Sequence, residues 1–419
     1  MKKLLVFLIC LVPYSLIGMN CIIEQNKLIP QQLISHGAPV QSVAWCCDFS
    51  LPGGPYAAIG GYYYGDSQKV VRVYNFQAGQ PCGQLEEKDS LPNTSINIPE
   101  SFVYAVDWSC TCSTLLAVGG ADEKVHIFGY DGESLSFVNS YTHGGIIYSV
   151  KWLCNCCESP NDLLLAIAGD KGSSNAEIEI LRVDAATGEI EKIAEGLFGN
   201  TVYSIDWCCR NGHAFLAAGG KISISCDVNL RLYCFECDNN SFNQVSYVAA
   251  HPNPVYAVRW CCEQGSKFQK LAVGGGKGID GINAVVYYLI NNQLKPVAPK
   301  SFVQDRIFAI DWNPFCDCSY VTFGGGCLVT TPTTCPDNIF VTEQDKCELN
   351  IITSTKFDDN ITSLEWCGNP EMQSSYLLVG SQINDWSQAD ICREHPMDPE
   401  VILYCAAFCI PGPTPLCAR

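Results

Sequence analysis

The chain has 419 residues, 47% of them hydrophobic, and its 43 Asp and Glu residues outnumber its 25 Lys and Arg residues. The resulting formal charge of −18 repels phosphate backbones, so we expect no nucleic-acid partner and favour neutral, cationic or Ca²⁺-bridged ones. By length alone, the chain has room for two or three domains.

Residues 1–20, MKKLLVFLICLVPYSLIGMN, begin with two lysines, continue with a mostly apolar run and end with small and polar residues. This order is typical of a bacterial secretory signal peptide and is too short for a membrane span. We expect cleavage after Gly18 or Asn20 and no further transmembrane segment. The residues before Cys21 are a poor lead-in for lipid modification, so no lipid anchor is expected there. The sequence thus predicts a secreted, periplasmic or cell-surface protein.

Seven copies of one phrase, each a short apolar run that ends in tryptophan, follow this segment. The steps between successive tryptophans are 63, 44, 55, 53, 52 and 54 residues. A repeat of this length indicates an array whose units bury their faces against their neighbours. The copies are VQSVAW at 40–45, VYAVDW at 103–108, IYSVKW at 147–152, VYSIDW at 202–207, VYAVRW at 255–260, IFAIDW at 307–312 and ITSLEW at 361–366.

Each copy continues with a cysteine-bearing turn, a second apolar run that ends in glycine, a variable loop and a third run rich in aromatic and β-branched residues. In the first copy these runs are AAIGG at 57–61 and VVRVYNF at 70–76. A fourth, weaker run precedes the next Trp phrase, as in LSFVNSYTHG at 135–144. Period-2 alternation between Gly-rich breaks is typical of strands. Four strands per unit and seven units predict an all-β protein, a seven-bladed β-propeller of four-stranded blades.

This order of elements, with a histidine shortly before the next unit at His36, His143 and His251, resembles the WD-repeat family of seven-bladed propellers. The resemblance covers essentially the whole chain after the signal segment. No unit carries the Trp-Asp dipeptide at the end of its third strand, and a short Asp-bearing loop after the glycines remains only at 121–124. The family's Asp-His-Ser/Thr-Trp network therefore does not carry over, and other contacts must stiffen the blades.

The two ends of the repeat indicate how the ring closes. Residues 28–35 have the form of a fourth strand with no blade before it, whereas the last unit ends with its third strand near Phe408. We expect the N-terminal strand to complete the last blade, because this removes an exposed sheet edge. The predicted organisation is a signal peptide at 1–20, one propeller at 21–410 and a C-terminal tail at 411–419.

Twenty-seven cysteines, 26 without Cys10 of the signal segment, are an even and high number for an exported chain and indicate disulfides. Most follow the repeat Trp, in turns that a propeller places on one face. Inner strands of adjacent blades can approach within disulfide reach, about 4.4–6.8 Å between Cα atoms, so we predict inter-blade disulfides. Vicinal disulfides, Zn²⁺ or Cu(I) binding and free thiols are the alternatives. The candidates are Cys46, Cys47, Cys110, Cys112, Cys154, Cys156, Cys157, Cys208, Cys209, Cys261, Cys262, Cys316, Cys318 and Cys367, together with Cys327 and Cys335, which share one loop.

The position before each Trp alternates in charge through the second to sixth copies. Strand alternation places it on the face opposite the Trp, next to a small residue two positions earlier. Opposite charges can then pair between blades, or the charges can simply face a wet channel. The residues are Ala44, Asp107, Lys151, Asp206, Arg259, Asp311 and Glu365.

Aromatic residues stand four positions before the Trp in the second to sixth copies. Such a stripe near the channel mouth can stack on a sugar or a peptide. Packing between blades is the favoured interpretation, because alternation puts this position on the same face as the Trp. The residues are Tyr104, Tyr148, Tyr203, Tyr256 and Phe308.

The loops between second and third strands are the most irregular parts of the repeat, and a propeller groups them on the face opposite the Trp turns. Irregular loops on a rigid scaffold are where binding usually resides. The alternative is that their side chains are only solvated or locally packed. The candidate partner-binding residues are Tyr62, Tyr63, Tyr64, Asp280, Asn283, Asp385 and Trp386.

Motifs for catalysis are missing from the sequence. It contains no GxSxG elbow, no HExxH helix and no Walker-type loop, so neither a cofactor nor a catalytic metal is predicted. A hydrolase with Asp107, Asp206 and Asp311 converging in the channel is the enzymatic alternative. The sequence favours an exported, non-catalytic binding platform, stabilised by disulfides, for a protein partner of unknown identity. A surface receptor for a glycan or host protein is the alternative within binding.

Overall fold

The structure is a computed structural model. It describes residues 29–408, without 36–38, 48–53, 63–68, 78–83, 92–101, 110–114, 155, 157–161, 172–175, 211, 223–227, 262–268, 314–318, 327–336, 346, 357–359, 370–373 and 383–401. The predicted signal peptide and C-terminal tail lie outside these residues. The described residues contain no helix long and apolar enough to cross a membrane.

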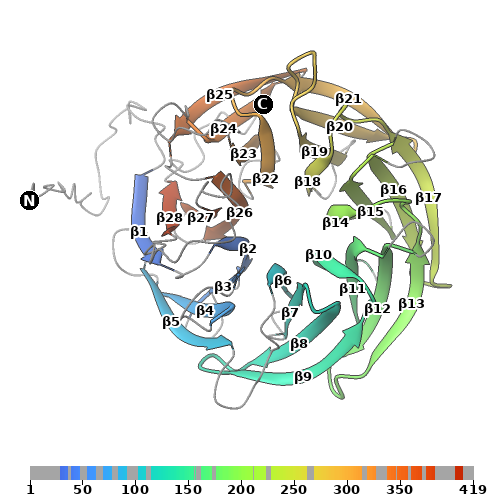
Figure 1. Cartoon of the computed structure of the whole chain (residues 1–419), viewed down its shortest axis with the longest axis vertical. Coiled ribbons are helices and arrows are strands. Elements are labelled where there is room, and N and C mark those ends of the chain that lie inside the picture. The colour runs from blue at the N-terminus through green and yellow to red at the C-terminus, as the bar shows by residue number, and fades with distance from the viewer. Residues whose placement is uncertain are drawn as a thin grey trace, which may run out of the picture.

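Four-stranded antiparallel sheets stand around a central channel (Figure 1). Six of them use four consecutive strands each, and the innermost strand always carries the repeat Trp. The all-β class and the four-stranded blades of a propeller are therefore confirmed. Blade 1 comprises β2 (Val40–Cys46), β3 (Tyr56–Gly61), β4 (Val71–Gln77) and β5 (Gln84–Leu91); blade 2 comprises β6 (Val103–Trp108), β7 (Leu115–Gly120), β8 (Lys124–Tyr130) and β9 (Leu135–Thr142).

The next four blades repeat this plan. Blade 3 comprises β10 (Ile146–Leu153), β11 (Asp162–Asp170), β12 (Ile178–Asp184) and β13 (Ile190–Gly196); blade 4 comprises β14 (Val202–Arg210), β15 (His213–Gly220), β16 (Leu230–Glu236) and β17 (Ser241–Val248). Blade 5 comprises β18 (Val255–Cys261), β19 (Gln269–Gly275), β20 (Ala284–Ile290) and β21 (Gln293–Lys300); blade 6 comprises β22 (Arg306–Trp312), β23 (Tyr320–Gly326), β24 (Ile339–Asp345) and β25 (Glu348–Thr355).

The remaining sheet, which we call the closing sheet, joins the two ends of the described chain. It comprises β26 (Asn360–Asn369), β27 (Ser374–Gln382), β28 (Ile402–Phe408) and the N-terminal β1 (Ile29–Ser35). Strand β1 pairs antiparallel with β28, from Ile29 opposite Ala407 to Ser35 opposite Ile402. Figure 1 shows β1 on the outer side of β28.

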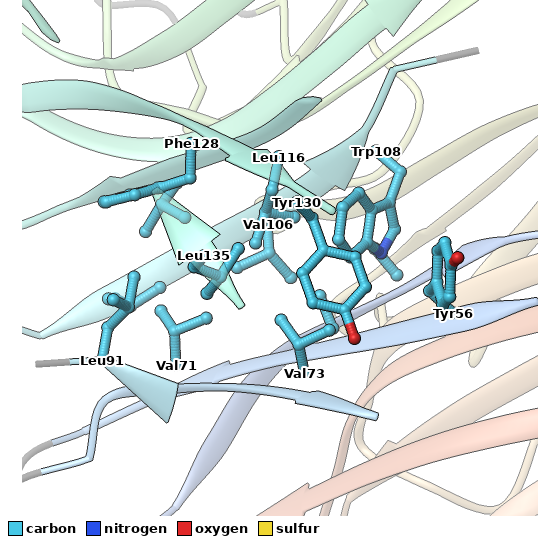
Figure 2. Close-up of a cluster of buried hydrophobic side chains, with 14 of the residues drawn as sticks. Tyr56, Val71, Val73, Leu91, Val106, Trp108, Leu116, Phe128, Tyr130 and Leu135 are labelled. Atoms are coloured by element: carbon cyan, nitrogen blue, oxygen red, sulfur yellow. The ribbon is translucent and has the colours of Figure 1, made fainter. Parts of the chain in front are cut away.

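The hydrophobic core lies between neighbouring blades. One cluster joins blades 1 and 2, where the rings of Tyr56, Trp108 and Tyr130 pack against one another (Figure 2). The Tyr56 and Tyr130 ring centroids are 4.9 Å apart, and those of Trp108 and Tyr130 are 5.8 Å apart. The repeat Trp is thus an inter-blade anchor, which explains why it recurs in every copy.

The first glycine of the repeated glycine pair allows adjacent blades to approach closely. A Cβ built on Gly60 would lie 2.7 Å from Val103 Cγ1 of blade 2, and a Cβ on Gly219 would lie 2.3 Å from Val255 Cγ1 of blade 5. Gly380 of the closing sheet meets Val40 of blade 1 in the same way, at 2.6 Å. A side chain at these positions would overlap the neighbouring blade.

We expect Gly219→Ala to lower the free energy of unfolding by about 1–3 kcal/mol, because the added methyl group overpacks the boundary between blades 4 and 5. Urea denaturation measures this loss. Adding Val255→Ala should recover part of it, since the two side chains occupy the same space. Gly129→Ala is the matched control, because its Cβ would meet only side chains of its own blade, Ser136 at 3.2 Å and Val138 at 3.7 Å. An equal loss in both single variants would contradict the close-approach explanation.

Candidate functional site

One face of the ring carries the loops between second and third strands and the connections between blades. We call it the mouth face. The repeat Trp lies at or near the end of each innermost strand, so the Trp turns lie on the opposite face. The innermost strands enclose a cavity of ≈ 430 Å³ in the channel, which we call the well. Together, the mouth face and the well are the candidate site.

Aromatic rings form an arc around the well. The ring centroids of Tyr104 and Tyr148 are 5.0 Å apart, and the arc continues from Tyr148 to Tyr203 and from Tyr203 to Tyr256, each at 5.5 Å. It ends at Phe308, 5.1 Å from Tyr256. Packing between blades is therefore confirmed for these rings. All five residues also line the well.

A β-bulge explains why these rings reach the channel. In each pair of first and second strands, the register shifts across the aromatic position, for example between Val202 and Ser204 around Tyr203. The extra residue of a bulge is unpaired and turns out of the regular alternation. The expectation that alternation places this position on the same face as the Trp was wrong, because period-2 alternation does not hold through the bulge.

Paired charges cross the channel below the aromatic arc. Lys151 Nζ lies 2.5 Å from Asp107 Oδ1 of the preceding blade. Arg259 Nε lies 2.7 Å from Asp311 Oδ1, and its terminal nitrogens lie 3.2 Å from Glu365 and 3.6 Å from Asp206. Pairing between blades is therefore confirmed as the arrangement of these charges. We call these six side chains the charge layer.

The carboxylates of the charge layer also hold the next blade directly. Asp107, Asp206 and Asp311 accept the backbone N–H of a Trp in a neighbouring innermost strand, at 2.8, 2.7 and 2.6 Å. Glu365 of the closing sheet accepts the backbone N–H of Trp45 of blade 1, at 2.7 Å. These bonds, with the charge pairs, stiffen the ring where the WD-repeat network is missing.

Burial shifts the pKa values of the charge layer. It raises the pKa of Glu365 to about 7, although Lys151 and Arg259 act in the opposite direction. It likewise raises the pKa of Asp206. Burial opposes the charge of Arg259, but Asp311, Asp206 and Glu365 hold its pKa well above the usual value. The layer thus contains a carboxyl group that takes up a proton near neutral pH.

The predicted partner-binding residues fall into different environments. Tyr62 is half-buried, with its ring centroid 4.6 Å from that of Phe102 and 5.8 Å from that of Tyr104, so it extends the aromatic arc. Asp280 is exposed on the mouth face. Tyr63, Tyr64, Asp385 and Trp386 lie outside the described residues.

Asn283 has a structural role and is not available for partner binding at the surface. Its side chain is fully buried, donates to the backbone oxygen of Gln304 and accepts the backbone N–H of Phe302. Asn229 holds the following connection of blade 4 in the same way, through Ala250 and His251. A buried polar residue just before the third strand therefore clamps the link to the next blade. Its position at the end of an irregular loop made Asn283 look like a binding residue.

Sequence reasoning missed an exposed apolar patch on the mouth face. Ile279 is fully exposed, and Val303 is 61% exposed in the connection that follows. The loop of Ile279 is tied to that connection, because Lys277 donates its backbone N–H to Asp305 and its Nζ to the Phe302 oxygen. We call Ile279, Asp280 and Val303 the blade-5 patch. No periodic signal marks it, because both apolar residues lie in loops.

Cysteines meet across two blade boundaries on the Trp-turn face. The Cys47 thiol hydrogen-bonds to Cys367, so it joins blade 1 to the closing sheet. The Cys156 thiol hydrogen-bonds to Cys209, so it joins blades 3 and 4. Cys154, Cys208 and Cys261 are disulfide-bonded, as is Cys237. The candidates Cys110, Cys112, Cys157, Cys262, Cys316, Cys318, Cys327 and Cys335 lie outside the described residues.

The charge layer is where the alternative of a channel-sited hydrolase would require its acid and base. Each of Asp107, Asp206 and Asp311 is already held by a backbone N–H and a cation. This arrangement suits cross-linking of blades better than proton transfer to a substrate. Among the described residues, no group of three or more His, Cys, Asp or Glu side chains could hold a metal ion.

Solved structures share this architecture. A chain in the crystal structure of the mitotic checkpoint complex is 14% identical, with a TM-score of 0.59, covering 97% of this chain and 98% of that one. Sqt1 from Saccharomyces cerevisiae is 12% identical, with a TM-score of 0.54, covering 86% and 87%. The shared feature is the propeller fold. No family model and no curated protein matches the sequence.

Proposed function

We propose that this protein is an exported, non-catalytic propeller of the WD-repeat type that binds a protein partner through its mouth face. The repeated Trp and glycine positions support the family, since the Trp residues pack in the core and the glycine allows close approach of the next blade in every blade except blade 3, which has Ala168 there. The similarity to solved propellers over nearly the full chain supports a single ring. The observation that carries the function is the blade-5 patch, whose two apolar side chains are exposed on loops that hydrogen bonds tie together.

The closing sheet forms the seventh blade of this ring in our proposal. Its contacts to blade 1 match those between the other blades. Ser363 accepts the backbone N–H of Val43 at 3.0 Å, as Ser204 accepts that of Val258 at 3.1 Å. Glu365 bonds to Trp45 as Asp206 bonds to Trp260. The N-terminal strand then supplies the fourth strand of the blade.

Protein interfaces concentrate their binding energy in a few apolar or aromatic anchors surrounded by polar groups. Ile279 and Val303 have this character, with Asp280 and Arg306 beside them in the same two segments. The patch is held by backbone bonds, so little entropy is lost when it is covered. The overall negative charge favours a partner with a neutral or basic contact surface.

We expect the double variant Ile279→Asp and Val303→Asp to lose partner binding at least about tenfold, because it places two charges in the interface. Cross-linking on the surface of the producing cell, followed by mass spectrometry, measures the captured species. Phe137→Asp with Ile351→Asp is the matched control, since both are exposed apolar side chains, at 50% and 46%, on outer strands away from the mouth face. Equal capture of a partner by wild type, the double variant and the control would contradict the proposed binding face, as would no capture by wild type.

Export and disulfide stabilisation belong to the same proposal. The N-terminal segment supports export, and the cysteines that meet across blade boundaries support covalent links between blades. An oxidising compartment is required for such links to persist. The two features therefore depend on each other, and the mass of the mature protein with and without reduction tests both.

A further inference from the structure

The well has the dimensions of a small-ligand site. Its volume of ≈ 430 Å³ falls within the usual range for such sites, about 300–1,000 Å³. All seven innermost strands line it, so they would surround a ligand around the axis of the channel. This shape suits a single terminal group and not an extended chain that runs across the surface.

The innermost strands offer no open edge on which a peptide strand could pair. Backbone N–H groups of these strands are already bonded across blade boundaries, as Val258 is to Ser204 and Ile205 is to Ser149. Trp152 and Trp260 are bonded in the same way to carboxylates of the charge layer. Recognition in the well therefore depends on side chains.

The walls and rim of the well present mainly hydrogen-bond donors. Ser149, Ser204 and Ser363 each accept a backbone N–H, so their own hydroxyl protons remain to be donated. Burial and the neighbouring tyrosines raise the pKa of Tyr148 to about 12, so its hydroxyl also stays a donor. Tyr203 behaves alike, with a pKa of about 12.

Both cations of the charge layer border the well, although the layer holds four carboxylates and only these two cations. Lys151 and Arg259 line the well, whereas none of the four carboxylates of the charge layer does. Their side chains remain 17% and 15% exposed, against 10–15% for the four carboxylates. The carboxylates hold the two cations in place, while the cations face the space that a ligand would fill.

A ligand that fits must carry acceptors around its edge, an anionic group at one end and a flat or ring-shaped body. The aromatic arc offers faces and edges on which a sugar ring stacks. We propose that the well binds a terminal sugar residue that bears a carboxylate, of the uronic or sialic acid type, with the carboxylate on Lys151 and Arg259. This site does not depend on the blade-5 patch or on its proposed partner.

The test is titration calorimetry of the full mature protein with D-glucuronate, with D-glucose, benzoate and N-acetylglycine as comparisons. We expect glucuronate to bind at least about tenfold more tightly than glucose, as for an added charge-assisted hydrogen bond. Tyr203→Phe keeps the ring but removes one donor and should weaken glucuronate about fivefold. Tyr247→Phe is the matched control, since Tyr247 is exposed on β17 outside the well.

Binding should also tighten from pH 8 to pH 6. Glu365 faces Arg259, Lys151, Asp311 and Asp107, and its protonation removes a negative charge near the ligand's carboxylate. If glucose and glucuronate bind with equal affinity, the proposed anionic site is wrong. If benzoate or N-acetylglycine binds more tightly than glucuronate, the proposed sugar ligand is wrong. No binding up to about 20 mM, or an unchanged Tyr203→Phe variant, overturns the well as a site. The blade-5 double variant should bind glucuronate normally, which separates this result from failure of the partner proposal.

Discussion

Replacing Arg259 with methionine is expected to lower the free energy of unfolding by about 3–5 kcal/mol, the loss typical of removing one member of a buried ionic cluster. Arg259 lies within 3.6 Å of Asp206, Asp311 and Glu365, and the variant leaves these carboxylates without their shared cation. Urea or thermal denaturation of the purified variant measures the loss.

The double variant Arg259→Met with Glu365→Gln separates charge from packing. Glutamine keeps an oxygen that accepts the Trp45 N–H but removes one negative charge, so we expect the double variant to be more stable than Arg259→Met at pH 8. If the two are equally stable at pH 8, the loss arises from packing and the electrostatic explanation is wrong.

The pH dependence of this effect has a definite sign. The pKa of Glu365 in the folded protein, about 7, lies above its unfolded value, so the folded state holds the extra proton between about pH 4.5 and 7. Its ionisation therefore removes stability as the pH rises through this window. Glu365→Gln alone should flatten that part of the wild-type stability profile.

A disulfide between Cys47 and Cys367 should stabilise the oxidised protein by about 2–4 kcal/mol, the usual range for a bond that closes a loop. The two thiols already hydrogen-bond across the boundary of blade 1 and the closing sheet. Oxidation by a small disulfide such as glutathione disulfide joins the two sulfurs, and the two electrons and two thiol protons pass to the oxidant, which becomes two thiols. Peptide mapping without reduction identifies the bond.

The stabilisation should be lost in Cys47→Ser and retained in Cys347→Ser, whose thiol is exposed in a turn of blade 6. Both variants are compared with wild type by thermal denaturation before and after reduction. Equal midpoints for oxidised wild type and oxidised Cys47→Ser would show that the contact does not become a covalent bond.

Much of this architecture follows from the repeat, because most repeated residues make the same contact with the neighbouring blade in successive copies. The Trp packs between blades, and the glycine after the second strand leaves space for the next blade, as Gly60 does for Val103. Charge alternation before the Trp likewise indicated pairing between blades as one of two possibilities, the other being charges that face a wet channel. The spacing of the repeated residues and the size of their side chains can be read from a short stretch of sequence. Because the units are alike, the same residues make the same contacts between successive units.

The position of the aromatic rings could not be predicted, because a bulge changes the direction of one side chain without any change in composition. Tyr203 and Ser204 look like an ordinary stretch of alternation, yet the register shifts between Val202 and Ser204. The role of Asn283 and the exposure of Val303 also depend on how one blade connects to the next. Such connections are long-range features that a single strand pattern does not contain.

The bonds of the charge layer run in one direction around the ring, with a side chain of one blade holding the backbone of another. At Glu365 and Trp45 this series passes from the closing sheet to blade 1. A linear repeat protein has a first and a last unit, from which it can unravel one unit at a time. Here every unit has a neighbour on both sides, so loss of any one leaves two exposed boundaries. The ring therefore tolerates partial opening poorly, and we expect its blades to unfold together in one cooperative transition on heating.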